Sequence, residues 1–116
     1  MTRAVAIVRD LMFRSKIDAV ARVSGAEVGY ASTIEAAIDR CAEAAPTIVF
    51  VDLSGAPSQA GDIAKRIREA APMVRIVGFA SHVDMKALRA ARDAGFDLTL
   101  SREEFTSRLA ELLGGT

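Results

Sequence analysis

The chain has 116 residues, of which 51% are hydrophobic and 26% are charged, and its 15 basic side chains balance its 15 acidic ones. This composition is typical of one globular domain, which we expect to span residues 1–116. The balanced charge argues against nucleic acid as a partner. With one cysteine, Cys41, and one histidine, His82, the chain can form neither an internal disulfide nor a multi-thiolate zinc site.

The sequence also bears on where the protein works. It starts without the charged-then-apolar pattern of a secretion signal, and no apolar run approaches the roughly 20 residues that span a bilayer. We therefore expect a cytoplasmic protein without a membrane partner. Cys41 lies on the apolar face of an expected helix, and we interpret it as a small buried hydrophobic residue.

Five short apolar runs along the chain predict β-strands. The first, third and fourth are almost continuous in β-branched and other apolar residues, as central strands that are covered on both faces require. The five predicted strands are Ala4–Val8, Ala26–Tyr30, Thr47–Val51, Val74–Phe79 and Leu98–Leu100.

The segments between these runs predict five amphipathic helices, because their apolar residues recur every three or four positions. The predicted stripes are Phe13, Ile17 and Val20; Ile34, Ile38, Cys41 and Ala45; Ile63, Ile67 and Ala70; Met85, Leu88 and Ala91; and Phe105, Leu109 and Leu112. Ser32 with Glu35, and Ser101 with Glu104, have the spacing of capping boxes and predict two helix starts.

Strictly alternating strands and helices predict an α/β fold with right-handed crossovers. We expect a flavodoxin-like three-layer sandwich with a five-stranded parallel sheet of order 2-1-3-4-5 and five helices. Ligands of such sheets bind beyond the carboxyl ends of the strands, at the switch point between strands one and three. Asp10 follows the first strand and Asp52 follows the third, so both carboxylates are expected at that edge.

Two carboxylates at one sheet edge favour two kinds of chemistry. They can hold Mg²⁺, which prefers oxygen ligands, or one of them can attack a phosphoryl group as a nucleophile. The alternative is that Asp10 only caps the first helix and that Asp52 is a solvated loop residue. The position of the two aspartates leaves both alternatives open.

The order of elements resembles a response-regulator receiver domain, the chemotaxis-regulator fold, from about Thr2 to Leu113. In "VFVDLSGAP", Asp52 stands at the phosphoacceptor position of that family, and Pro57 and Gly61 echo the proline and glycine that follow it. "VRIVGFASH" and "ALRAARDAGFDLTLSR" are similar to the fourth strand with its loop and to the fourth helix with the fifth strand. The resemblance implies Mg²⁺ bound by Asp10, Asp52 and the backbone carbonyl of Ser54.

The chain departs from the receiver pattern around this site. The acidic pair of the family reads "RD", so Arg9 replaces one carboxylate and we expect Mg²⁺ to bind more weakly. Arg9 either pairs with Asp52 or turns to solvent. Ala80 stands at the hydroxyl position, and Ser81 either supplies the missing hydroxyl or caps a helix that begins near Val83.

Arg102 replaces the lysine of the family and Glu103 replaces the proline that follows it. Arg102 keeps the positive charge, but a planar guanidinium needs a different geometry from an ammonium group. If Ser101 caps the last helix, Arg102 lies in its first turn, where it either reaches the acidic edge or points away from it. The candidate site residues are therefore Asp52, Ser81 and Arg102, with Asp10, Asp52 and Ser54 for a metal ion.

These features imply a stand-alone, receiver-like signalling domain of a two-component-type phosphorelay, with weak or absent phosphorylation of Asp52 and no enzymatic activity of its own. Its expected partner is a sensor kinase, a phosphotransfer protein or a downstream target, bound through the fourth helix, fifth strand and fifth helix. The sequence leaves open whether the chain also forms a homodimer through that face. One alternative is a phosphorylation-independent interaction module. A small flavodoxin-like enzyme or nucleotide binder is disfavoured, because "VRDLMFRSK" has no glycine for a phosphate loop.

Overall fold

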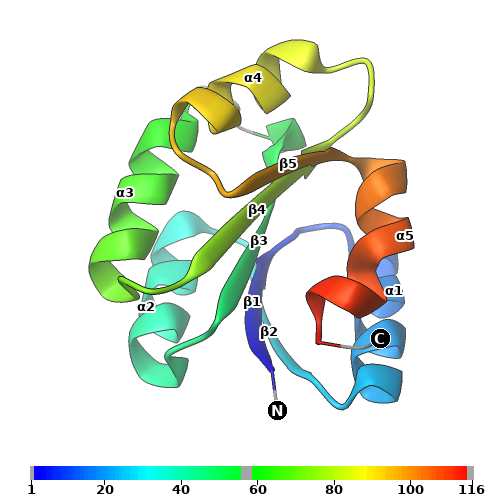
Figure 1. Cartoon of the computed structure of the whole chain (residues 1–116). Coiled ribbons are helices and arrows are strands. Elements are labelled where there is room, and N and C mark those ends of the chain that lie inside the picture. The colour runs from blue at the N-terminus through cyan, green and yellow to red at the C-terminus, as the bar shows by residue number, and fades with distance from the viewer. Residues whose placement is uncertain (1, 56–58, 115–116) are drawn as a thin grey trace.

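The computed structural model describes residues 2–55 and 59–114, which form five successive strand–helix units (Figure 1). Every predicted strand is present, and each strand end lies within one residue of its predicted position. The elements are β1 (Arg3–Ile7), α1 (Leu11–Ser24), β2 (Glu27–Ala31), α2 (Ile34–Ala44), β3 (Ile48–Asp52), the 3₁₀ turn η1 (Leu53–Gly55), α3 (Ala60–Ala70), β4 (Arg75–Ala80), α4 (Met85–Asp93), β5 (Leu98–Ser101) and α5 (Arg102–Leu112).

The strands form one parallel sheet of order β2-β1-β3-β4-β5, which confirms the predicted flavodoxin-like topology. Ile7 at the end of β1 is in register with Val51, one residue before the end of β3. The chain leaves β1 toward β2 on one side and leaves β3 toward β4 on the other. The switch point of the sheet therefore lies at Asp10 and Asp52, as the sequence predicts.

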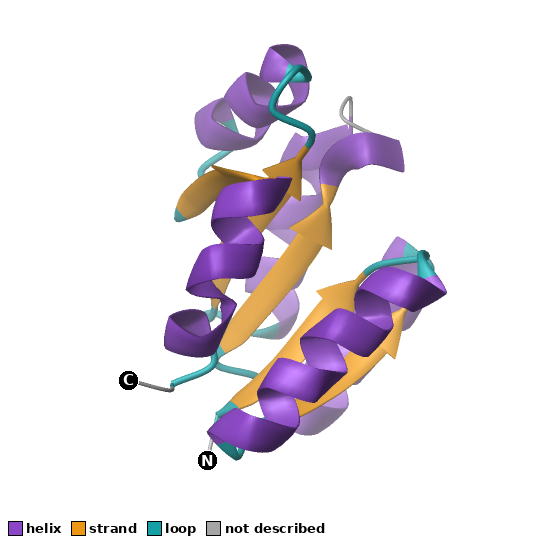
Figure 2. Cartoon of the chain, turned by 90° about the vertical axis from the view of Figure 1, so that its right-hand side faces the viewer, coloured by secondary structure: helices purple, strands orange, loops and turns teal. Residues whose placement is uncertain are grey.

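Helices cover both faces of the sheet. Helices α1 and α5 lie on one face, and α2, α3 and α4 lie on the other (Figures 1 and 2). The α1/α5 side of the core contains four of the chain's five phenylalanines, and Phe105 packs at its centre. The Phe105 ring stacks on Phe79 with centroids 4.2 Å apart and meets the edge of Phe50 at 5.0 Å. Phe13 lies 5.3 Å from Phe79 and thereby joins α1 to the same cluster.

The start of α2 corrects the predicted capping box of Ser32 and Glu35. The N-cap is Thr33, whose hydroxyl accepts a hydrogen bond from the Ala36 N–H at 3.1 Å. The hydroxyl of Ser32 instead accepts a hydrogen bond from the Arg14 guanidinium at 2.8 Å. The helix therefore starts one residue later than predicted, and the Ser32 hydroxyl is engaged by α1 instead.

Two predicted stripe residues lie outside the core. Met85, the first residue of α4, is exposed, and Ala45 follows α2 in the left-handed region with a φ of 47°. Both therefore stand at a helix end. Cys41 is buried, as predicted, and burial raises the pKa of its thiol.

The start of α5 agrees with its predicted capping box. The Ser101 hydroxyl accepts a hydrogen bond from the Glu104 N–H, and the Glu104 carboxylate accepts one from the Ser101 N–H. These hydrogen bonds, first of all that from the Ser101 backbone, lower the pKa of Glu104. Because β5 ends at Ser101, the box makes Arg102 the first helical residue and fixes its backbone at the carboxyl edge of the sheet.

Within the two described ranges, no helix combines the length and the apolar character that crossing a bilayer would require. Of the two residues that echo the proline and glycine of the receiver family, Pro57 lies outside the described residues. Gly61 lies in the first turn of α3.

Tyr30 offers a pH-dependent test of how β2 packs against α1. Its hydroxyl donates a hydrogen bond to the Arg14 carbonyl at 3.2 Å. Burial, and then the charge of Asp18, raises the pKa of Tyr30 to about 12, from an ordinary value near 10. The raised pKa means that Tyr30 contributes to stability fully below about pH 10 and loses this contribution as the pH rises toward the folded value.

Since Tyr30 is the one tyrosine and the chain has no tryptophan, the near-ultraviolet absorbance of phenolate reports on this residue alone. We expect a titration midpoint about two units higher in the folded protein than in denaturant. Equal midpoints would show that Tyr30 is solvated and that β2 does not pack on α1 as described.

Candidate functional site

Asp52, the last residue of β3, is held in a partly enclosed position at the switch point. Its side chain is 15% exposed, so it is not a solvated loop residue. Its Oδ1 accepts hydrogen bonds from the Ser54 hydroxyl at 2.6 Å and from the Ser54 N–H at 3.1 Å. The chain turns immediately after β3 into η1, which brings Ser54 back over the carboxylate. The strand thus presents a fixed carboxylate at the edge of the sheet.

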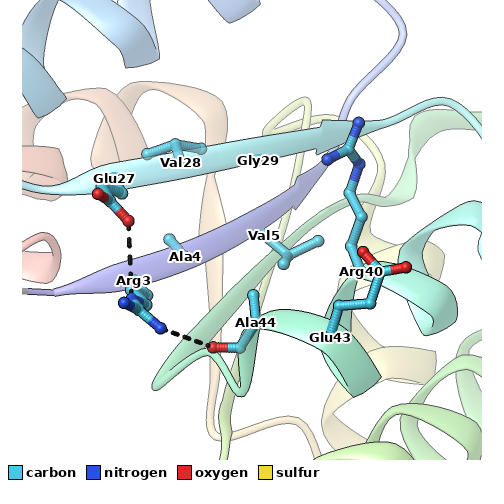
Figure 3. A pocket seen from close by; sticks show the side chains of 9 residues that line it. All are labelled: Arg3, Ala4, Val5, Glu27, Val28, Gly29, Arg40, Glu43 and Ala44. Carbon is cyan, nitrogen blue, oxygen red and sulfur yellow. Dashed lines mark hydrogen bonds and ion pairs between the residues drawn. The ribbon is translucent and has the colours of Figure 1, made fainter.

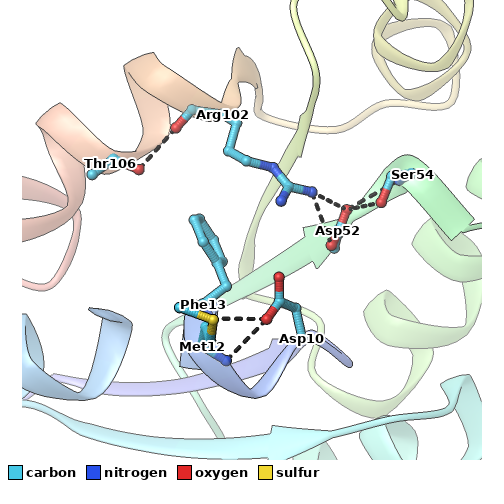
Figure 4. Close-up of polar contacts among 7 residues, drawn as sticks. All are labelled: Asp10, Met12, Phe13, Asp52, Ser54, Arg102 and Thr106. Carbon is cyan, nitrogen blue, oxygen red and sulfur yellow. Dashed lines mark hydrogen bonds and ion pairs between the residues drawn. The ribbon is translucent and has the colours of Figure 1, made fainter. Parts of the chain in front are cut away.

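Arg102 is the cation of the site. One terminal guanidinium nitrogen lies 3.4 Å from Asp52 Oδ2 and 3.5 Å from Oδ1 (Figure 4). The guanidinium carbon also lies 5.1 Å from the centroid of the Phe13 ring and 5.9 Å from that of Phe79. Of the two predicted alternatives for Arg102, the structure has the one that reaches the acidic edge. The rings of Phe13 and Phe79 and the carboxylate of Asp52 together fix the direction of the Arg102 side chain.

Arg9 follows β1 but does not contact Asp52 among the described interactions. Its Nε donates a hydrogen bond to the Ser32 carbonyl at 3.0 Å, which directs the side chain toward the connection between β2 and α2. The alternative in which Arg9 neutralises Asp52 is therefore wrong for this structure. The guanidinium still lines the same cavity as Asp52, at the place where the receiver pattern has a carboxylate.

Asp10 caps α1, as one of the two sequence alternatives states. Its Oδ1 accepts hydrogen bonds from the Met12 N–H at 2.9 Å and the Phe13 N–H at 3.3 Å. Asp10 also lines both of the cavities that Arg102 lines, so capping and a role at the site are compatible. Figure 4 shows its position below the pair of Arg102 and Asp52.

Beyond β4, Ala80 stands at the position where the resemblance to receivers implies a hydroxyl. Ala80 is fully buried, and Ser81 is exposed with its hydroxyl 3.4 Å from the Val83 N–H, from which it accepts a hydrogen bond. Helix α4 starts later than predicted, because Asp84 is its N-cap and accepts a hydrogen bond from the Ala87 N–H at 3.2 Å. Ser81 therefore caps a turn, and its catalytic role stays a prediction.

Two cavities flank the pair of Arg102 and Asp52. One of about 470 Å³ lies toward α2 and α3 and includes Asp52, Ser54 and Arg9. The other, of about 700 Å³, lies between the starts of α1 and α5 and includes Ser81. Asp10 and Arg102 line both, so their side chains separate the two spaces. Solvent thus approaches the carboxylate edge from two sides.

A third hollow, of about 330 Å³, lies at the opposite end of the sheet, where β1 and β2 begin (Figure 3). Arg3 bridges it, with an ion pair to Glu27 at 3.6 Å and a hydrogen bond to the Ala44 carbonyl at 3.5 Å. It lies away from the carboxyl edge and from all of the predicted site residues.

The resemblance to receivers implies Mg²⁺ at the carboxyl edge, but the donor atoms present do not fit a resident ion. Mg²⁺ requires near-octahedral oxygen ligands. Both oxygens of Asp52 face Arg102, and Oδ1 also holds two donors from Ser54, while Oδ1 of Asp10 holds two backbone N–H groups. In residues 2–55 and 59–114, no three side chains of the metal-ligating types His, Cys, Asp and Glu converge on one point.

Sequence reasoning missed two features of the site. The rings of Phe13 and Phe79 support Arg102, although the pattern predicts Phe13 only as a core residue. The hydroxyl of Ser54 contacts Asp52, whereas the sequence suggested only its carbonyl. A small hydroxyl residue two positions after a strand-end aspartate is the signal that could have indicated this contact.

Comparison with solved structures establishes the fold. The chain superposes on a response regulator from Thermotoga maritima with a TM-score of 0.82 at 17% identity, covering 98% of this chain and 95% of that one. For the CheY-like protein TadZ from Pseudomonas aeruginosa the TM-score is 0.78 at 19% identity, with 98% of both chains covered. For the chemotaxis response regulator CheY4 of Vibrio cholerae it is 0.80 at 15% identity, with 98% and 97% covered. No protein-family model and no curated protein matches the chain.

Proposed function

We propose that this chain is an atypical receiver-like signalling domain, in which Asp52 is the candidate phosphoacceptor and phosphorylation is weak or absent. The proposal rests on one observation above the others. The strand-end carboxylate at the switch point of a receiver fold is retained, and it is 15% exposed and paired with Arg102. The altered neighbours Arg9, Ala80 and Glu103 support the restriction on phosphorylation.

The contacts of Asp52 indicate which oxygen would react. Oδ1 accepts two hydrogen bonds from Ser54 and also faces Arg102, whereas Oδ2 has Arg102 as its one partner among the described residues. Oδ2 would attack the phosphorus of an acyl phosphate and form an oxygen–phosphorus bond. The bond from phosphorus to the acyl oxygen would break, and the donor's own carboxylate would leave. The Arg102 guanidinium already contacts this oxygen and lowers its nucleophilicity, so we expect this step to be slow.

We further propose that output passes through protein contact at α4, β5 and α5. Strand β5 is one of the two edge strands of the sheet and lies between these two helices (Figure 1). Arg102 is the first residue of α5, so the group that contacts Asp52 belongs to the same element as the proposed partner surface. A sensor kinase, a phosphotransfer protein or a downstream target is the expected class of partner.

A second candidate function is a phosphorylation-independent interaction module, and the Arg102 contact favours it. A carboxylate that already faces a guanidinium has part of its charge compensated without any phosphoryl chemistry. The surface at α4, β5 and α5 would then bind its partner constitutively.

The test is treatment of the purified protein with Mg²⁺ and acetyl phosphate, read by intact mass. We expect the mass of one phosphoryl group on a minor fraction of the chains at most, and none on the Asp52→Asn variant. Rapid and complete conversion would contradict the proposal and make the chain a conventional receiver. A gain that persists in Asp52→Asn would place the acceptor elsewhere. No gain at all agrees with absent phosphorylation and would favour the interaction module as the way in which the chain acts.

A further inference from the structure

We infer that Arg102 is the resident cation of the Asp52 site, so that the site is charge-compensated by the chain itself and excludes a divalent metal ion. The inference deepens the proposed function and rests on it for the importance of Asp52. It differs from the sequence prediction, which attributed weakened metal binding to Arg9 alone.

The first argument is the balance of charge. The cavity of about 470 Å³ is lined by three carboxylates and two guanidinium groups, those of Asp10, Glu35, Asp52, Arg9 and Arg102. Glu35 has a cation of its own, since its carboxylate lies 3.9 Å from Arg66. The remaining two carboxylates face two arginines. A divalent cation entering this space would meet no net negative charge to attract it.

The second argument is the position of Arg102 relative to the atoms that a metal ion would use. Its nitrogen lies within 3.5 Å of both carboxylate oxygens of Asp52. An ion that coordinates Asp52 directly, at about 2 Å, would have to displace this nitrogen. It would recover only two carboxylates in exchange, because Arg9 stands where a third would be.

The third argument is that Arg102 is already held in place. The capping box at Ser101 and Glu104 fixes the start of α5, and the Arg102 carbonyl accepts a hydrogen bond from the Thr106 hydroxyl at 2.9 Å. The guanidinium lies against Phe13 and Phe79. A tethered cation with a restricted side chain loses little entropy when it pairs, whereas a free ion must be bound and partly dehydrated.

The test is a Mg²⁺ titration followed by the amide NMR shifts of Asp10, Asp52 and Ser54. We expect no saturable shift in the wild-type protein up to millimolar Mg²⁺. The double variant Arg9→Asp with Arg102→Ala restores a carboxylate and removes the cation, so we expect saturable binding at least about tenfold tighter. Arg9→Asp alone is the matched control, and it should remain much weaker than the double variant because Arg102 still faces Asp52.

Saturable binding to the wild-type protein as tight as that of the double variant would overturn the inference. Flat titrations of both proteins would overturn it too, since Arg102 would then not be what excludes the ion. If the double variant lacks native amide dispersion, the Nε–H resonance of Arg102 in the wild-type protein decides. It should be unaffected by Mg²⁺ and shifted by Asp52→Asn, and a Mg²⁺-dependent shift would contradict the inference.

These results are separable from those that test the proposed function. Phosphorylation of Asp52 without measurable Mg²⁺ binding would support the resident cation. Mg²⁺ binding without phosphorylation would refute the resident cation and leave the interaction module in place.

Discussion

Replacing Phe105 by alanine is expected to lower the free energy of unfolding by about 3–5 kcal/mol. Phe105 is fully buried and contacts rings from three other elements, Phe13 of α1, Phe50 of β3 and Phe79 of β4. The variant would leave a cavity between α5 and the sheet and remove the ring that stacks on Phe79. Denaturant unfolding monitored by circular dichroism measures the loss.

Ser107→Ala is the matched control for this prediction. Ser107 is an exposed residue of the same helix, and the one hydrogen bond of its hydroxyl within residues 2–55 and 59–114 goes to the Glu104 carbonyl, at 3.1 Å. We expect a change of less than about 0.5 kcal/mol. If Phe105→Ala costs no more than this control, α5 does not pack on the sheet as described.

Arg102→Ala is expected to destabilise the protein by about 1–3 kcal/mol, because it leaves the Asp52 carboxylate at the sheet edge without its cation. The figure lies below that of a fully buried pair, since the Arg102 side chain is 37% exposed. The variant also removes the group that covers Phe13 and Phe79. Thermal or denaturant unfolding at neutral pH measures the effect.

The chain offers a close control in Arg108→Ala. Arg108 is 38% exposed and belongs to the same helix, but its partner Glu111 is 67% exposed, against 15% for Asp52. We expect less than about 0.5 kcal/mol for this pair. A cycle with Asp52→Asn should give a coupling of about 1 kcal/mol between Asp52 and Arg102. Equal losses in Arg102→Ala and Arg108→Ala would mean that Asp52 does not depend on Arg102.

The fold was largely predictable because each strand corresponds to a short apolar run in the local sequence. The runs that became β1, β3 and β4 are apolar on both faces, and the periodic stripes of α1, α3 and α5 lie against the sheet. One error lies at the start of α2, where two neighbouring residues can both act as N-cap. Thr33 is the cap, and the Ser32 hydroxyl accepts a hydrogen bond from Arg14 instead.

The candidate site was only half predictable. The topology brings the strand-end carboxylates together, so Asp10 and Asp52 could be placed at one edge from the order of strands alone. The sequence could not tell which arginine would contact Asp52, because both Arg9 and Arg102 follow strands that end at the same edge of the sheet. The choice depends on side-chain contacts, since Ser32 engages Arg9 and the phenylalanine rings direct Arg102.

The most direct test of the central claim is the stoichiometry of phosphoryl transfer to Asp52, measured by intact mass during treatment with acetyl phosphate and Mg²⁺. We expect a minor fraction of modified chains or none, with no modification in Asp52→Asn, because in our proposal Arg102 faces the reactive oxygen and no metal ion assists. Fast, stoichiometric modification that depends on Asp52 and on Mg²⁺ would contradict this account of the site.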